Sequence, residues 1–225
     1  MKLSILVSSI LLLITFSTSG QERSYNITIK SRNEVISLTN QANQKIKDLH
    51  PEEAFPLLLK AIAIDSTIVD AYELMYNAAM SAKRGSSEVV AVLQKGRRIY
   101  PEDDELSFYL ADIYRISEKL PKAIAEYSTA IRLSKSQTTT PKLIHSYYFN
   151  RGTCYLKVKN YDAAILDYAE CLKSDPENSF TNLNMGNCYY NKKQIAKARI
   201  YWQKSADMGN GAAKEYISKS AKMVH

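Results

Sequence analysis

Apolar positions recur at helical spacing between residues 145 and 178. Tyr148, Gly152 and Tyr155 stand at i, i+4 and i+7, which places them on one face of a helix. A polar break follows, at which Asn160 is a suitable helix cap. A second apolar face then begins, formed by Ala164, Ile165, Tyr168, Cys171 and Leu172. An Asp-Pro pair closes it, because proline disfavours helical geometry in the residue before it. The segment is predicted to be a helix, a turn, a helix and a second turn.

The same pattern returns 34 residues later. Matching residues at this spacing are Asn150 and Asn184, Gly152 and Gly186, Cys154 and Cys188, Tyr155 and Tyr189, Ala164 and Ala198, and Tyr168 and Trp202. Two antiparallel helices approach within about 8–10 Å only where their crossing carries little side chain. We therefore expect Gly152 and Ala164 to meet at the crossing, with tyrosines filling the flanks.

The repeat extends over most of the chain. Its five expected units are residues 35–68, 69–103, 104–144, 145–178 and 179–212. The third unit has seven extra residues, which the polar stretch SKSQTTTPK accounts for. Pro56 is expected to bend or break the second helix of the first unit. Residues 213–225 read as an amphipathic helix that covers the last hairpin, whose apolar face would otherwise be exposed.

Composition supports an all-α fold. The 225 residues include only 7 glycines and 6 prolines, too few for a β protein with many tight turns. The order of aromatic, small and proline residues in the 34-residue unit resembles the tetratricopeptide repeat. The stretch KARIYWQKSADMGNGAAKEYI also resembles the related Sel1-type repeat. The resemblance implies a right-handed superhelical solenoid of about five hairpins plus a C-terminal capping helix. It also implies a concave surface, lined by the first helix of each hairpin, that binds peptides or proteins.

Short amide side chains recur on these first helices. Asn150 and Asn184 stand two residues before the position of the small residue in the repeat, and Asn43, Asn77 and Asn187 stand one residue after that position. Asparagine offers both a donor and an acceptor, so it can pair with the backbone of an extended peptide. The alternative is that asparagine is simply an acceptable polar residue on an exposed helix face.

Aromatic residues on the same helices are candidate anchors for a partner. They are Phe149, Phe180 and Tyr190, with Phe108 and Tyr109. Arg115 is a candidate basic contact, with Lys157 beside it in the repeat pattern. The alternative for most aromatic residues is packing between helices. The set of lysine, arginine and asparagine residues that clamps a C-terminal carboxylate in some members of the family is not reproduced.

No catalytic or cofactor motif is found. The three histidines are far apart in the sequence, and there is no glycine-rich phosphate loop or zinc-protease signature. We expect a non-catalytic protein without a cofactor or metal. Cys154, Cys171 and Cys188 are expected to be buried free thiols. A disulfide between Cys171 and Cys188 is the alternative, since second helices pack on the following first helix.

The N-terminus has the pattern of a signal peptide over residues 1–20. Lys2 precedes the apolar run LSILVSSILLLITF, and small residues end it at Gly20. We expect cleavage there and a secreted or periplasmic protein without a transmembrane segment; the alternative is an uncleaved N-terminal anchor. Residues 21–34 are a linker or partial helix, and Asn26 begins a glycosylation sequon.

The partner is expected to be a protein or peptide, and no nucleic acid. The alternative is a polyanion, a polysaccharide or nucleic acid, bound by the basic surface. The chain has a formal net charge of +7, which loss of Lys2 lowers by one, but its Lys and Arg residues are spread along the whole sequence. A self-assembling array is a third possibility.

Overall fold

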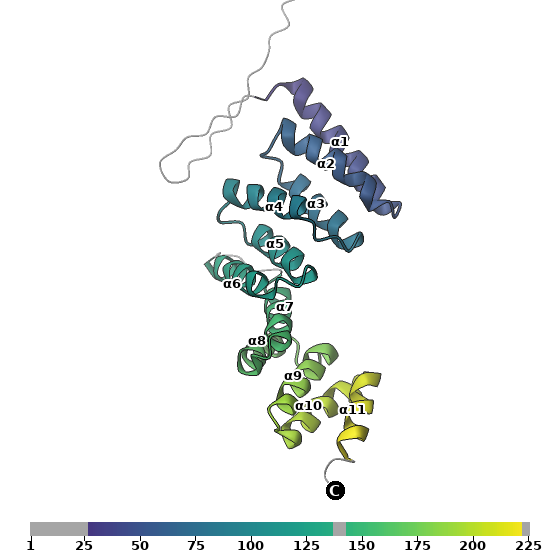
Figure 1. The fold of residues 1–225 in the computed structure, drawn as a ribbon, viewed down its shortest axis with the longest axis vertical. Coiled ribbons are helices and arrows are strands. Elements are labelled where there is room, and N and C mark those ends of the chain that lie inside the picture. Colours follow the sequence, from purple (N-terminus) through teal and green to yellow (C-terminus); the bar gives the residue numbers. More distant parts are fainter. Residues whose placement is uncertain (1–26, 137–142, 222–225) are drawn as a thin grey trace, which may run out of the picture. The chain divides into compact units, whose positions relative to one another are not determined.

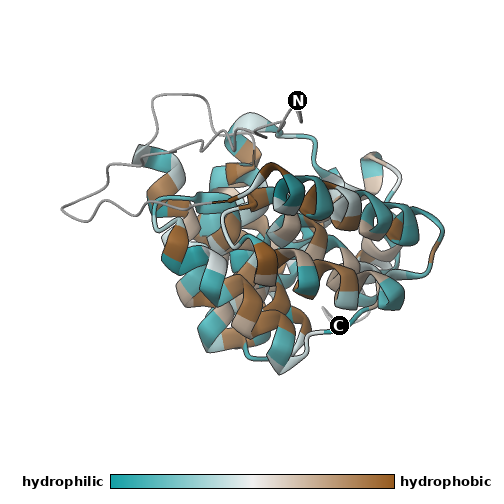
Figure 2. Cartoon of the chain, turned by 90° about the horizontal axis from the view of Figure 1, so that it is seen from above, coloured by the Kyte–Doolittle hydropathy of each residue, from teal (hydrophilic) through white to brown (hydrophobic). Residues whose placement is uncertain are grey.

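The computed structural model describes residues 27–136 and 143–221, and within them it contains eleven α-helices and no strand (Figure 1). The all-α fold class is confirmed. The signal peptide expected at residues 1–20 and most of the insertion in the third unit lie outside the described residues. Each helix carries both hydrophobic and hydrophilic positions (Figure 2), as the apolar periodicity predicts.

The chain divides into two compact units between Arg84 and Gly85. The first unit holds α1 (Ile29–Lys47), α2 (Pro51–Ile64) and α3 (Val69–Ser81). The second holds α4 (Ser87–Ile99), α5 (Asp104–Ile116), α6 (Leu120–Ser136), α7 (Ile144–Lys157), α8 (Tyr161–Ser174), α9 (Ser179–Asn191), α10 (Ile195–Asp207) and α11 (Gly211–Ala221). The division falls inside the hairpin expected at residues 69–103. Tyr76 stands in α3 where the other first helices have alanine or glycine, so the small residue of the repeat is missing at this point of the chain.

In the second unit, each helix from α5 to α11 packs on the one before it in the sequence. The pairs α5 and α6, α7 and α8, and α9 and α10 form helical hairpins (Figure 1). The first helices of neighbouring hairpins also touch, α5 with α7 and α7 with α9. The helix α11 packs on α10 and buries Ala213 beside Trp202, so it covers the end of the last hairpin.

The turn inside each hairpin begins at an equivalent residue of the repeat. Leu49, Lys83, Glu118, Lys159 and Lys193 all have a positive φ, between 51° and 64°. This left-handed conformation ends the first helix and reverses the chain, at a cost of about 1–2 kcal/mol for a residue other than glycine. The next helix can then begin at once: Asn160, the expected cap, accepts a hydrogen bond from the backbone N–H of Ala163.

The glycine of each repeat faces an aromatic ring of the second helix. A Cβ atom at Gly152 would lie 3.0 Å from Cε1 of Tyr168, and one at Gly186 would lie 2.4 Å from Cδ1 of Trp202. The expected meeting of Gly152 with Ala164 is therefore corrected: the ring of Tyr168 takes the nearest position. The reason is that an aromatic side chain can fill the space that an absent side chain leaves, which buries more apolar surface than an alanine does.

The expectation that Pro56 breaks its helix is wrong. The helix α2 runs without interruption from Pro51 to Ile64. Pro56 lies in the second turn, where it removes one backbone hydrogen bond. The burial of Ala54, Phe55, Leu58, Ala61 and Ile62 along the same helix outweighs this loss.

A substitution of Gly186 tests the close contact between α9 and α10. We expect Gly186→Ala to lower the free energy of unfolding by about 1–3 kcal/mol, because its Cβ atom overlaps Trp202. This loss opposes the gain of about 1 kcal/mol that alanine normally brings to a helix. Urea denaturation followed by the fluorescence of Trp202 measures the difference. Gly211→Ala is the control, since no heavy atom lies within 4 Å of its Cβ position; equal stability of the two variants would contradict the prediction.

Candidate partner-binding surface

A hydrogen bond joins the two helices of each hairpin from α5 to α10. The acceptor stands one position after the small residue of the first helix, and the donor is the aromatic residue 15 positions later on the second helix. The three donor and acceptor pairs are Tyr127 and Asp112, Tyr168 and Thr153 (3.3 Å), and Trp202 and Asn187 (3.0 Å). The residue that follows the small residue therefore holds the two helices of its hairpin together. Asn187, which was predicted to contact a partner, is one of these residues.

Asn150 and Asn184 connect neighbouring hairpins. Nδ2 of Asn150 donates to Oδ1 of Asp112 across 3.2 Å. The amide of Asn184 acts on the hydroxyl of Tyr168 and lowers its pKa, against the rise that burial causes. Each asparagine thus lies near the hydrogen-bonded pair of the preceding hairpin. Since the amide of Asn150 already has a partner, its contact with a peptide backbone would have to compete with that bond. Their role in partner binding stays a prediction.

Arg115 supports the first of these hairpins. Its Nε donates to Oδ1 of Asp112 at 2.9 Å and to the hydroxyl of Tyr127 at 3.0 Å. Burial, together with the negative charge of Asp112, raises the pKa of Tyr127 and keeps its hydroxyl protonated. The guanidinium group of Arg115 neutralises the carboxylate of Asp112, whose side chain is only 4% exposed. Arg115, predicted to contact a partner, therefore has a structural role in this hairpin.

A second buried ion pair joins α7 to α8 and was not found from the sequence. Nε and Nη2 of Arg151 donate to the two carboxylate oxygens of Asp167 at 2.8 and 2.7 Å, and Nη1 donates to Ser128 of α6. Burial raises the pKa of Asp167, and the hydrogen bond from Arg151 opposes that rise. The separation of 16 residues equals that of Gly152 and Tyr168, so the hairpin register could have indicated the pair.

The predicted aromatic anchors lie in different environments. Phe149 packs against the core, with its ring centroid 6.0 Å from that of Tyr168. Phe108 and Tyr109 are buried as well. Phe180 is 65% exposed, and Tyr190 lies beside Trp202 with the ring centroids 5.4 Å apart. Tyr190 also packs against the core around Trp202, so among the three predicted anchors Phe180 is the exposed one.

The first unit has a polar hollow on its first helices, α1 and α3, with a volume of about 300 Å³. Its lining residues are Thr39, Asn40, Asn43, Asp70, Glu73, Leu74 and Asn77. The predicted contacts Asn43 and Asn77 thus line one site, and neither side chain hydrogen bonds to another described residue. The residues at the same repeat position in the second unit accept a hydrogen bond from an aromatic residue that stands 15 positions later. The residue 15 positions after Asn43 is Leu58, whose side chain has no donor.

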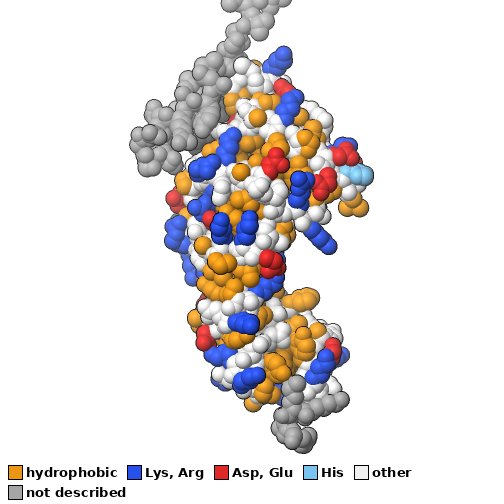
Figure 3. Space-filling model, viewed as in Figure 1, with side chains coloured by type: hydrophobic (Ala, Val, Ile, Leu, Met, Phe, Trp, Pro, Cys, Tyr) orange, Lys and Arg blue, Asp and Glu red, His pale blue; other side chains and the backbone are white. Residues whose placement is uncertain are grey.

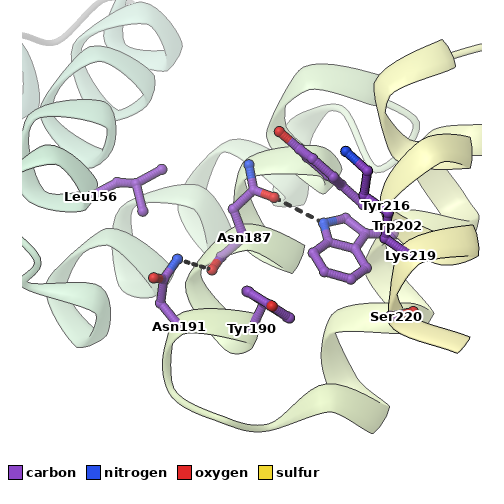
Figure 4. A pocket seen from close by; sticks show the side chains of 8 residues that line it. All are labelled: Leu156, Asn187, Tyr190, Asn191, Trp202, Tyr216, Lys219 and Ser220. Atoms are coloured by element: carbon purple, nitrogen blue, oxygen red, sulfur yellow. Dashed lines mark hydrogen bonds between the residues drawn. The ribbon is translucent and has the colours of Figure 1, made fainter. Parts of the chain in front are cut away.

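The second unit has a hollow at its C-terminal end, with a volume of about 450 Å³. Its lining residues are Leu156, Asn187, Tyr190, Asn191, Trp202, Tyr216, Lys219 and Ser220. Figure 4 shows Asn187 joined to Trp202 by its hydrogen bond, with Leu156 coming from a separate helix. Asn187 and Tyr190 were predicted from the sequence. Trp202, Tyr216 and Lys219 were missed, because the repeat pattern assigned the tryptophan to packing and the last helix to capping.

The three cysteines are free and buried, as expected. Burial raises the pKa of Cys154 to about 11 and those of Cys171 and Cys188 to about 12. A thiol with so high a pKa stays protonated at neutral pH and is a poor nucleophile. The cysteines therefore act as small apolar core residues.

In the part of the chain that the structure describes, no cluster of His, Cys, Asp and Glu side chains could hold a metal ion. None of the helices described is both long and apolar enough to span a membrane. On the face shown in Figure 3, Lys and Arg side chains lie at many points, with Asp and Glu among them. Several of these Lys and Arg side chains form ion pairs with carboxylates, such as Lys45 with Glu53 and Lys157 with Glu118. Lys157, named with Arg115 as a possible basic contact, is thus an exposed ion-pair partner.

Comparison with known proteins agrees with the fold. The family model of the tetratricopeptide repeat matches residues 145–178. The crystal structure of MamA has a TM-score of 0.68 and 17% identity, covering 82% of this chain and 95% of that one. The crystal structure of YrrB, described as a TPR protein with an unusual peptide-binding site, has a TM-score of 0.67 and 22% identity, covering 85% and 95%.

A curated relative matches part of the chain. The UDP-N-acetylglucosamine–peptide N-acetylglucosaminyltransferase of Giardia intestinalis is 31% identical over 112 residues, which is 49% of this chain. The match spans only 7% of that enzyme's length, so it carries no activity over. Residues 145–178 thus form a tetratricopeptide repeat, and the chain has a fold like that of the MamA and YrrB structures. The Sel1-like character of the last repeat stays a prediction.

Removal of one connecting amide tests whether Asn150 is structural. We expect Asn150→Ala to lower the free energy of unfolding by about 0.5–1.5 kcal/mol, because Asp112 loses a hydrogen bond in a buried site. Asn33→Ala, on an exposed position of α1, is the control and should change stability by less than about 0.5 kcal/mol. Thermal unfolding followed by circular dichroism measures both. Equal melting temperatures for Asn150→Ala and the unsubstituted chain would show that the contact contributes nothing.

Proposed function

We propose that this chain is a non-catalytic interaction module that binds a protein or peptide partner on the surface of its first helices. The observation that carries the proposal is the placement of predicted residues in two hollows, Asn43 and Asn77 in the first unit and Tyr190 in the second. The likeness to YrrB, a TPR protein with a peptide-binding site, supports this reading. The side chains of Asn43 and Asn77 can each donate and accept, as an extended backbone requires.

A photocrosslinking amino acid in place of Asn77 tests the proposal. In cells that naturally make the protein, we expect it to form an adduct with one discrete protein or peptide. The matched control is the same substitution at Leu166, which is 69% exposed but lies on the second helix α8. No adduct at position 77, or identical adducts at both positions, would contradict the proposal. An adduct with nucleic acid or polysaccharide that disappears at moderate salt would favour the polyanion alternative.

We further propose that the protein is exported and that residues 1–20 are its signal peptide. The support is the order of a basic residue, an apolar run and small residues before Gln21. Intact-mass measurement of the protein from its source cells should give a chain that begins at Gln21, recovered from the envelope or the medium. A mass that includes the apolar run would overturn cleavage, and recovery with the membrane would then favour the anchor.

A further inference from the structure

The hollow at the C-terminal end of the second unit has the size and lining of a ligand site. Its volume of about 450 Å³ lies within the range of about 300–1,000 Å³ that is usual for such sites. Four elements contribute to it: α7, α9, α10 and α11. Such a convergence of side chains from separate helices does not result from the packing of any one hairpin.

Aromatic rings form one wall of this hollow. The ring centroid of Trp202 lies 5.4 Å from that of Tyr190 and 5.4 Å from that of Tyr216. Leu156 adds an aliphatic surface from α7 (Figure 4). Rigid aromatic side chains bury a large apolar area at low cost in conformational entropy, which suits them to hold an apolar side chain of a partner.

Asn187 supplies an oriented hydrogen-bond donor at the edge of this wall. Its Oδ1 accepts from Nε1 of Trp202 at 3.0 Å, and an indole N–H can only donate. The amide is therefore fixed with its oxygen toward the indole and its Nδ2 away from it (Figure 4). This NH₂ group can donate to a carbonyl or carboxylate oxygen of a ligand.

The charge of the lining favours an acidic ligand. Lys219 is the one charged residue among the described lining residues. Its Nζ lies 2.6 Å from Glu215, but both side chains are more than half exposed, 62% and 59%. An ion pair this exposed is weak, so Lys219 can exchange Glu215 for a carboxylate that is held beside the pocket.

We propose that this pocket binds one large apolar side chain of an extended peptide segment that carries an aspartate or glutamate next to it. The apolar side chain contacts Tyr190 and Tyr216, which pack on the buried ring of Trp202, and the neighbouring carboxylate accepts from Lys219. This inference rests on the proposed function and specifies the chemistry of the segment that the second unit recognises.

The single tryptophan of the chain makes the test direct, because Trp202 lines the pocket. The probe is acetyl-Gly-Ser-Phe-Glu-Gly-Ser-amide, titrated into the full chain while the Trp202 emission is recorded. We expect a saturable change in emission. Probes with alanine in place of phenylalanine, or lysine in place of glutamate, should bind at least about 10-fold more weakly, which corresponds to about 1.4 kcal/mol.

Variants of α11 separate the two contacts. Lys219→Gln should reduce the preference for glutamate over glutamine in the probe at least about 3-fold, as expected for one exposed charge contact. Lys214→Gln is the matched control, since it removes the same charge from an exposed position of the same helix outside the pocket. Tyr216→Ala should weaken every phenylalanine probe, and a circular dichroism melt checks that it still folds.

The proposal is overturned if the first probe does not change the Trp202 emission at millimolar concentration, or if the lysine probe binds as well as the glutamate probe. Equal effects of Lys219→Gln and Lys214→Gln would also overturn it. These outcomes are distinct from failure of the proposed function, because crosslinking through position 77 examines a partner on the first unit. An adduct there without probe binding rejects only the pocket assignment.

Discussion

The close approach of an aromatic ring to a glycine is the contact on which the second unit depends. Gly152 faces Tyr168 and Gly186 faces Trp202, and each ring occupies the space that a side chain at the glycine would fill. Because the two residues belong to opposite helices of a hairpin, their contact sets how far one helix is shifted along the other. A shift of even one residue would place a bulky neighbour against the ring, so the register has a single solution.

This register determines where the polar groups of the hairpin meet. With Gly152 opposite Tyr168, the hydroxyl of that tyrosine reaches Thr153, and Arg151 reaches Asp167. The hairpins, the all-α class and the covering last helix could be predicted from the sequence, because they follow from the spacing of small and aromatic residues. The partners of Asn150 and Asn187 could not, since these side chains look the same in a sequence whether they contact a ligand or another helix.

The difference between Asn43 and Asn187 shows why the candidate site needed the structure. Both follow the small position of a first helix, and the pattern of the first helices alone treats them alike. Asn187 meets an indole N–H from the opposite helix, whereas the corresponding position opposite Asn43 is Leu58. The identity of one residue, 15 positions away, thus decides whether an amide is held in the hairpin or left to pair with something else.

At the C-terminal end of the second unit, packing and the proposed recognition share residues, since Asn187 and Trp202 join two helices and also line the hollow. Structures with only 17% and 22% identity to this chain share its fold, because few positions of the repeat are needed for packing. The remaining surface positions are free to vary. In the hollow of the first unit, these positions carry amides beside two carboxylates, Asp70 and Glu73. In the hollow of the second unit, they carry aromatic rings beside Lys219. Because an acidic hollow and a basic one attract opposite charges, a single uniform polyanion is a poorer match to both than a peptide of mixed sequence.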